Sequence, residues 1–204
     1  MLKKNILYIA VLILAILITI ISYFDKNKQA TDEPPLGGDF SIPVAQGSLN
    51  DPKKEIFKLQ DYRDKVVVLY FGYASCPDIC PTALAIIGNT LKKLPAQIQA
   101  QIQPMFISVD PERDKLSALS EYGKYFYPTM ISATDSTANI NKLVTQYGAF
   151  YRINKQNDSA MGDSVYHTST VYIIDKKGKM VNTINHADIQ NDLESTVISL
   201  TKGQ

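Results

Sequence analysis

The apolar and polar positions divide the chain into an apolar N-terminal run, a short polar stretch and a long remainder with alternating strand and helix patterns. Residues 6–24 form an unbroken apolar run without a charged side chain. As a helix this run is about 28 Å long, close to the hydrocarbon thickness of a bilayer. Residues 22–25, at the end of the run, do not form the small-residue cleavage site of a signal peptide. We therefore expect one transmembrane anchor over residues 5–24, preceded by a tail of residues 1–4.

The flanking charges predict the orientation of this anchor. Lys3 and Lys4 precede the apolar run, so the positive-inside rule places residues 1–4 in the cytoplasm and everything after the anchor on the outer side. Lys26 and Lys28 lie on the other flank and reduce this asymmetry. Residues 25–38 are polar and end in Pro-Pro and Gly-Gly, a composition typical of a flexible tether.

The remaining residues, 39–204, are predicted to fold as one domain. About 165 residues are enough to bury a core without extra covalent staples. The net charge is +1, and charges of both signs are interspersed along the chain. Because no basic stripe is present, nucleic acid is not an expected partner.

Strand and helix patterns alternate along this domain. Apolar runs without polar alternation predict strands covered on both faces at 66–71, 105–109 and 170–174. Weaker patterns predict strands at 56–59, 149–153 and 180–184. Helices are predicted at 81–94, between the acidic turn at 110–114 and residue 126, at 137–147, and from about 188 to near the end of the domain. Residues 154–163 are predicted to form a loop. This order predicts an α/β fold, a three-layer sandwich with a mixed central sheet.

The chain contains only two cysteines, and their position suggests chemistry. Cys76 and Cys80 follow a buried strand and open a helix, where the positive end of the helix dipole favours a thiolate. Pro77 and Pro81 stiffen the loop that carries them. A thiolate is both the nucleophile of disulfide exchange and a ligand for soft metals. An inert disulfide or two buried structural thiols fits this loop less well.

The spacing of the cysteines leaves two alternatives open. Redox loops of thioredoxins separate the cysteines by two residues, whereas three residues separate Cys76 from Cys80. The wider loop still permits a disulfide, but it also lets two thiolates hold a soft ion, Cu(I) above all outside the cytoplasm. In a thioredoxin-like sheet the loop before the penultimate strand packs against the cysteine loop. His167 is therefore the expected third ligand, and His186 is expected to be an ordinary surface residue.

Four motifs of this chain, at residues 70–82, 106–114, 147–151 and 167–175, resemble those of the Sco/SenC family of copper proteins. The resemblance implies a thioredoxin-like fold on a membrane tether, in a bacterial cytoplasmic membrane with the C-terminal domain on the periplasmic side. It implies copper binding by Cys76, Cys80 and His167. The implied partners are the copper-accepting subunit of cytochrome c oxidase, a thiol reductant and the lipid bilayer. Many relatives carry an acidic residue where this chain has Tyr166.

Two functions compete on these residues. The first is a metallochaperone that delivers copper to the CuA centre of cytochrome c oxidase. The second is a thiol–disulfide oxidoreductase that uses Cys76 and Cys80 as a redox pair and reduces the cysteines of a partner protein. A peroxidase of the peroxiredoxin kind is disfavoured, because such enzymes usually carry threonine a few residues before the reactive cysteine and position 73 is tyrosine. Copper-responsive signalling is a further alternative that stays open. Two interpretations of Asp78 stay open: it orients the cysteine loop or raises the pKa of a thiolate, or it is a solvated turn residue at the helix N-terminus. Residues 110–114 are expected to form a strand-to-helix turn with acidic residues in the first helical turn.

Overall fold

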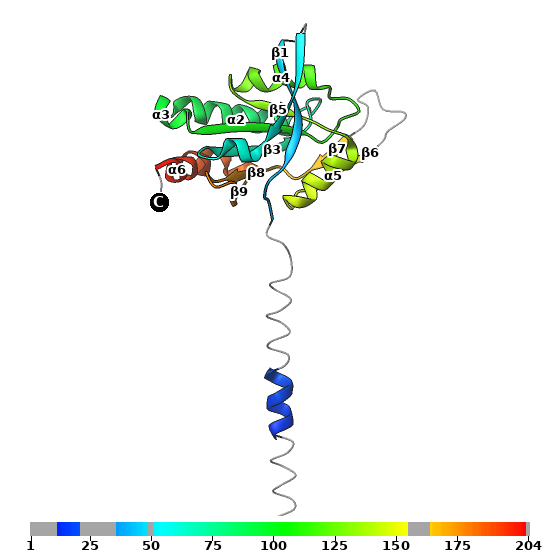
Figure 1. Cartoon of the computed structure of the whole chain (residues 1–204), viewed down its shortest axis with the longest axis vertical. Helices are drawn as coiled ribbons and strands as arrows, with labels where there is room; N and C mark the ends of the chain where they lie inside the picture. Colours follow the sequence, from blue (N-terminus) through cyan, green and yellow to red (C-terminus); the bar gives the residue numbers. More distant parts are fainter. Residues whose placement is uncertain (1–11, 21–35, 49–50, 155–163, 203–204) are drawn as a thin grey trace, which may run out of the picture. The chain divides into compact units, whose positions relative to one another are not determined.

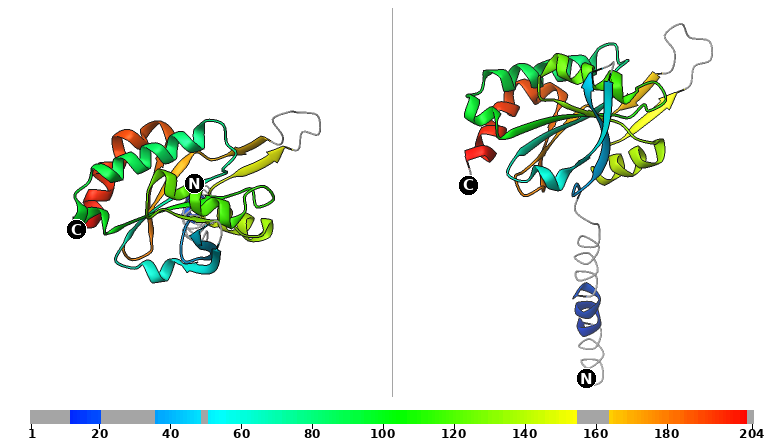
Figure 2. Two further views of the ribbon diagram at one scale, coloured as in Figure 1. Left: turned by 90° about the horizontal axis from the view of Figure 1, so that it is seen from above. Right: turned by 45° about the horizontal axis from the view of Figure 1, so that its top comes forward.

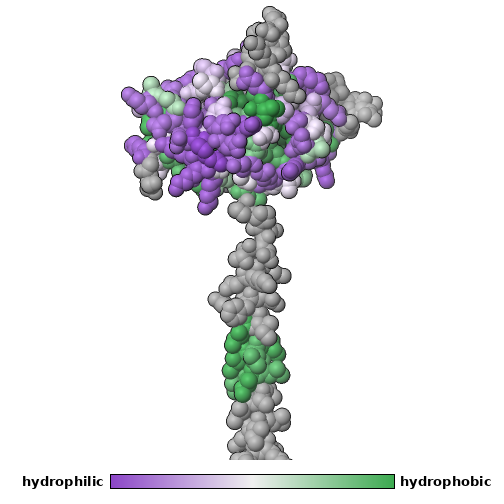
Figure 3. Space-filling model, in the orientation of Figure 1, coloured by the Kyte–Doolittle hydropathy of each residue, from purple (hydrophilic) through white to green (hydrophobic). Residues whose placement is uncertain are grey.

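The computed structural model of the 204-residue chain describes residues 12–20, 36–48, 51–154 and 164–202. The chain forms two compact units, Met1–Pro35 and Leu36–Gln204. In the first unit residues 12–20 are helical, and Figure 3 shows their exposed side chains as predominantly apolar. No helix within the described ranges has both the length and the apolarity to cross a membrane. Residues 5–11 and 21–24 of the expected anchor lie outside those ranges.

The second unit is built on a seven-stranded mixed sheet (Figure 1). Its strand order is β2-β1-β5-β4-β3-β8-β9. The central strands β3, β4 and β5 are parallel, and the outer strands pair antiparallel. Every residue of β3 and of β4 is buried, as expected for strands covered on both faces. The strands are β1 (Ser41–Ser48), β2 (Asp51–Lys58), β3 (Val66–Gly72), β4 (Ile102–Ser108), β5 (Ile131–Ala133), β8 (Thr170–Ile174) and β9 (Met180–Asn185).

Helices cover both faces of this sheet (Figure 2). On one face α2 contacts α4 and α6. On the opposite face Tyr147, which follows α5, packs its ring against Phe71 and Tyr172 at centroid distances of 6.1 Å. This arrangement confirms the expected α/β fold with a mixed central sheet. The helices are η1 (Leu59–Tyr62), α2 (Ile79–Lys93), α3 (Ala96–Gln99), α4 (Leu116–Phe126), α5 (Thr137–Gln146), η2 (His186–Asp188) and α6 (Ile189–Lys202).

Three strands were not predicted from the sequence. β5 is only three residues long, too short for a periodic pattern to show. β1 contains Pro43 and Gly47, residue types that are depleted in strands, yet it pairs with β2 along its whole length. The third is β7 (Ser164–His167), which pairs with β6 (Tyr151–Asn154) in a separate two-stranded ribbon. The predicted loop at 154–163 lies, apart from Asn154, outside the described residues.

The β6–β7 ribbon carries one of the expected metal ligands. Its register pairs Tyr151 with His167 and Arg152 with Tyr166. Because side chains alternate across a strand, Tyr166 points to the face opposite His167, and its side chain is 62% exposed. The side chain of Tyr166, the sequence neighbour of the histidine, therefore points away from it.

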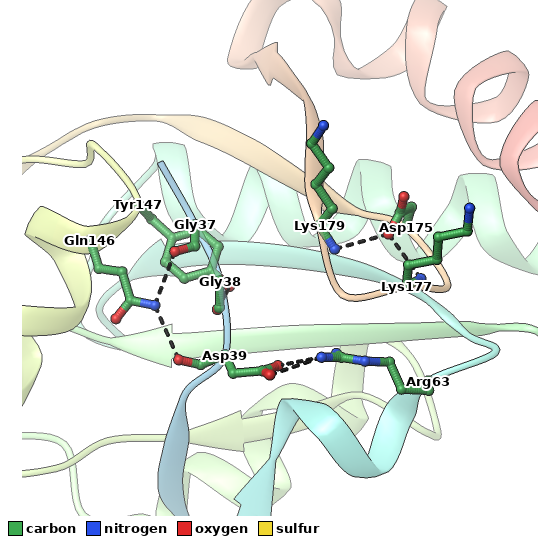
Figure 4. Close-up of polar contacts among 9 residues, drawn as sticks. All are labelled: Gly37, Gly38, Asp39, Arg63, Gln146, Tyr147, Asp175, Lys177 and Lys179. Carbon is green, nitrogen blue, oxygen red and sulfur yellow. Dashed lines mark hydrogen bonds and ion pairs between the residues drawn. The ribbon is translucent and has the colours of Figure 1, made fainter. Parts of the chain in front are cut away.

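The folded unit begins with a short segment that is hydrogen-bonded to the end of α5 (Figure 4). The backbone N–H of Gly37 donates to the carbonyl of Gln146 at 2.7 Å, and the Gln146 amide donates to the carbonyls of Gly37 and Asp39 at 3.1 Å. The Tyr147 hydroxyl donates to the carbonyl of Gly38 at 2.9 Å. Residues that the sequence assigns to the tether are thus held on the domain from Leu36 onward.

Substitution Tyr147→Phe should weaken this attachment. The Tyr147 side chain is 1% exposed. Removal of its hydroxyl leaves the Gly38 carbonyl without this hydrogen-bond donor. We expect the free energy of unfolding to fall by about 1 kcal/mol, measured by denaturant titration. The control is Tyr125→Phe, at a side chain that is 82% exposed, which should change it by less than about 0.5 kcal/mol. Equal effects of the two substitutions would contradict the assignment.

Candidate metal centre

Cys80 lies in the first turn of α2 and is fully buried against the end of β3. Gly72 ends β3 and makes room for the sulfur. A Cβ added at Gly72 would lie 2.9 Å from Cys80 Sγ and 3.2 Å from Cε1 of Tyr70. Both distances are shorter than ordinary van der Waals contact, so a larger residue at position 72 would displace the sulfur. The glycine therefore creates the space in which Cys80 sits.

Cys76 lies in the loop before α2 and is only partly buried. The backbone N–H of Cys80 donates to Cys76 Sγ at 3.4 Å, so the sulfur lies at the N-terminus of the helix. An anionic sulfur is favoured there by the helix dipole. The Asp78 side chain is exposed and makes no capping hydrogen bond to the helix backbone. The backbone of the helix start, and not this carboxylate, therefore acts on Cys76.

His167 is the last residue of β7, and its imidazole is directed at Cys80. Nε2 lies 3.1 Å from Cys80 Sγ, and Nδ1 lies 3.1 Å from the carbonyl oxygen of Thr168. A carbonyl can only accept, so Nδ1 carries the proton and the lone pair of Nε2 faces the sulfur. The rings of Tyr70 and Tyr73 meet the imidazole edge to face, with centroids at 6.0 and 5.9 Å.

The structure brings Cys76, Cys80 and His167 together. Their ligand atoms, two sulfurs and one ring nitrogen, all lie within 4.8 Å of one another. This group could hold a metal ion, and two thiolates with one imidazole favour a soft or borderline ion such as Cu(I). His186 lies in η2 between β9 and α6 and is not part of this group.

The two cysteines differ in their acidity. Burial acts to raise the pKa of Cys76, but hydrogen bonds from the backbone N–H groups of Cys80 and Asp78 outweigh it and lower the pKa below its usual value. Burial raises the pKa of Cys80 far above its usual value. Burial also lowers the pKa of His167, so its imidazole is neutral and available as a ligand. In the metal-free protein the Cys80 thiol therefore donates its hydrogen to Nε2 of His167.

Asp114 supports the cysteine loop, and this role was not predicted from the sequence. Its buried carboxylate accepts hydrogen bonds from the backbone N–H of Ala74 at 2.8 Å and from the Ser108 hydroxyl at 2.5 Å. The Arg113 guanidinium lies over the Tyr73 ring, 5.6 Å from its centroid. A usable signal was that parallel neighbouring strands end at one edge of a sheet, so the turn after β4 must meet the loop after β3.

The difference in acidity predicts selective alkylation of the reduced, metal-free chain by iodoacetamide. Only the thiolate reacts, so the rate at Cys76 should rise with pH through a midpoint below 9.0, the usual pKa of a cysteine. Cys80 stays protonated to a higher pH, and its rate at pH 8 should be at least about tenfold lower. Peptide mass spectrometry measures both rates. Similar rates at the two cysteines would contradict the assigned environments.

The chain is similar to known proteins along most of its length. The family model described as SCO1/SenC matches residues 28–202. A SCO2-like protein of Rickettsia prowazekii is 36% identical over 176 residues, which cover 83% of this chain and 85% of that protein.

Solved structures extend the likeness to the fold. Apo Sco1 from Thermus thermophilus is 29% identical, with a TM-score of 0.70 over 82% of this chain and 92% of that one. Yeast Sco1 with copper bound is 26% identical, with a TM-score of 0.69 over 84% of this chain and 91% of that one. These likenesses confirm the expected thioredoxin-like fold. With the family pattern running through most of its length, the chain belongs to the SCO1/SenC family.

Proposed function

We propose that the chain is a membrane-anchored copper metallochaperone that assists assembly of the CuA centre of cytochrome c oxidase. The observation that carries this proposal is the convergence of Cys76, Cys80 and His167, with ligand atoms within 4.8 Å of one another. A relative of the same fold, yeast Sco1, has been solved with copper bound. The copper-accepting subunit of the oxidase is the partner that the family resemblance implies.

The positions of the protons in the metal-free site make copper binding depend on pH. Copper binds as cargo to deprotonated sulfurs, so binding must remove the Cys80 proton that points at His167. Cys76 has the lower pKa and contributes its thiolate more readily. Removal of the Cys80 proton also frees the lone pair of Nε2, so a single deprotonation makes two ligands available. Copper binding should therefore tighten as pH rises.

Transfer to an acceptor requires an exposed ligand. Cys80 is fully buried, whereas Cys76 is partly exposed on the loop before α2. An incoming thiolate or imidazole of the acceptor therefore approaches from the Cys76 side, while Cys80 and His167 still hold the ion. Ligand exchange of this kind passes copper on without releasing it to water.

We also propose that residues 5–24 anchor the chain in the bacterial cytoplasmic membrane, with the copper-binding domain on the periplasmic side and the polar residues between the two, up to Pro35, as a tether. The uncharged apolar run of residues 6–24 supports the anchor, and Lys3 and Lys4 support the orientation. Alkaline carbonate washing of membranes should leave the full-length chain in the pellet. Its release into the supernatant would contradict the anchor.

A second candidate function, thiol–disulfide oxidoreductase, is favoured by the unequal acidity of the cysteines. The Cys76 thiolate would attack a partner's disulfide and form a mixed disulfide, releasing one partner thiol. Cys80, after losing its proton, would attack Cys76 Sγ and release the second thiol, which leaves the partner reduced and a Cys76–Cys80 disulfide behind. A thiol reductant must then regenerate the pair. This reaction uses both sulfurs without requiring a third ligand.

Substitution His167→Ala separates the two functions. The wild-type reduced chain should retain one Cu(I) per chain, and His167→Ala should weaken binding by more than about 100-fold, because a ligand is lost and not merely a neighbour of one. Competition with a chromophoric Cu(I) chelator measures the affinity. The control His186→Ala, at the histidine outside the group, should leave the affinity unchanged.

The outcome also addresses the second candidate. Absence of copper binding by the reduced wild-type chain would contradict the metallochaperone. Reductase activity that persists in His167→Ala would then support the oxidoreductase.

A further inference from the structure

The β6–β7 ribbon has two chemically different faces. Ile153 and Val165 share the inner face with His167 and pack against the hydrophobic core. Because side chains alternate along a strand, Arg152 and Tyr166 lie together on the outer face, directly opposite each other in the register. Arg152 is exposed, and the Tyr166 side chain is 62% exposed. The outer face therefore meets solvent with an aromatic ring beside a cation.

Phe150 continues this outer face by one position. Its backbone carbonyl accepts a hydrogen bond from the Thr168 N–H at 2.8 Å, and its own N–H donates to the Thr168 hydroxyl at 2.9 Å. These bonds extend the register of the ribbon, so Phe150 lies two residues from Arg152 on the same side and diagonally across from Tyr166. The Phe150 side chain is 60% exposed. Phe150, Arg152 and Tyr166 together are named the outer ribbon patch.

The folded unit does not use the outer ribbon patch for its own packing. Across the described residues Arg152 forms no ion pair, and neither ring of the patch meets another aromatic ring. Three aromatic side chains of these residues are more than half exposed, and only Tyr125 lies outside the patch. Single exposed apolar side chains are ordinary, whereas a group of them on one face marks a binding surface. Figure 2 shows that the ribbon projects from the body of the domain.

The composition of the patch favours a protein as its occupant. Aromatic residues and arginine are enriched in protein–protein interfaces, where a few of them contribute most of the binding energy. Arg152 is the only lysine, arginine, aspartate or glutamate in residues 150–154 and 164–168, so the patch is complementary to an acidic group. Attraction to a lipid surface needs a cluster of basic residues, which one arginine does not supply. A second copy would place two small cationic patches against each other, where like charges repel.

We propose that the outer ribbon patch binds the protein that accepts copper, through an acidic segment whose carboxylate pairs with Arg152 and whose apolar side chains pack against Phe150 and Tyr166. A guanidinium binds a carboxylate through two parallel hydrogen bonds, which fixes the orientation of the partner. This inference rests on the proposed function and adds the surface and the chemistry by which the acceptor is recognised.

The position of the patch suits this partner. His167, a proposed copper ligand, lies on the inner face of the same ribbon. Thr168, the next residue along the chain, is the one that is hydrogen-bonded to Phe150. An acceptor held on the outer face is therefore one ribbon thickness from the imidazole.

The charge of the patch is tested with the metal-free, full-length chain and the metal-free copper-accepting subunit of cytochrome c oxidase, both in detergent. Biolayer interferometry measures their affinity at low and high salt. Arg152→Glu should weaken binding by about tenfold or more at low salt and reduce its salt dependence. The matched control is Lys177→Glu, the same charge reversal at an exposed side chain in the turn at the end of β8 far from the ribbon. It should leave the affinity within about twofold of wild type.

The rings are tested by Phe150→Thr combined with Tyr166→Thr, since threonine keeps the preference for a strand. This double variant should weaken acceptor binding by about 30-fold or more, as expected for a pair of residues that dominates an interface. The control Tyr125→Ala removes an exposed ring from α4 and should leave it unchanged. The Cu(I) affinity of every variant should stay within about twofold of wild type, because these side chains do not face the ligands. If the double variant binds Cu(I) more weakly, the ribbon has loosened, and Arg152→Glu decides.

Three results would overturn the proposal. The first is an Arg152→Glu chain that binds the acceptor as tightly as Lys177→Glu, and the second is a wild-type chain that does not bind the acceptor. The third is an effect of Arg152→Glu on another partner alone. A change in self-association measured by sedimentation would assign the patch to a second copy. An effect that appears only in vesicles containing phosphatidylglycerol would assign it to lipid.

Failure of this inference is distinguishable from failure of the proposed function. Acceptor binding is measured without copper, so a wild-type chain that binds the acceptor through the patch but retains no Cu(I) contradicts the metallochaperone and leaves the patch standing. Conversely, Cu(I) transfer to the acceptor that is equally fast in wild type and Arg152→Glu supports the metallochaperone and contradicts the patch.

Discussion

The contact between Cys80 Sγ and His167 Nε2, 3.1 Å long and spanning 87 positions of the sequence, is the interaction on which the site depends. It forms only because α2 places the sulfur at the end of β3 and the β6–β7 ribbon places the imidazole over it. The remaining features keep the two partners in position. Gly72 leaves space for the sulfur, and the rings of Tyr70 and Tyr73 border the imidazole.

The sequence predicted most of the central sheet because its strands carry strong patterns. The apolar runs at residues 66–71 and 170–174 correspond to β3 and β8, whose length and burial leave little alternative to a covered strand. The strands β1, β5 and β7 were not predicted, because β5 and β7 are only three and four residues long and β1 contains Pro43 and Gly47. The anchor expected at residues 5–24 stays a prediction.

The candidate ligands were predictable for a different reason. Two cysteines in a proline-stiffened loop at a helix start are chemically conspicuous, and the chain offers only two histidines. The groups that support the ligands were not conspicuous. Asp114 looks like an ordinary residue of a helix-opening turn, and its bond to the Ala74 N–H appears only when β3 and β4 lie side by side. Tyr70 looks like any aromatic core residue of a strand. Sequence patterns identify ligands by residue type, whereas supporting contacts depend on the fold.

The separate ribbon has a consequence for how the site can open. The two sulfurs belong to the body built on the seven-stranded sheet, but the imidazole belongs to a two-stranded ribbon whose strands, among the residues that the structure describes, pair with each other and with no strand of that sheet. Tilting the ribbon would withdraw the imidazole without breaking a single hydrogen bond of the main sheet. The arrangement of the proposed ligands can therefore change while the pairing of the seven-stranded sheet stays as it is.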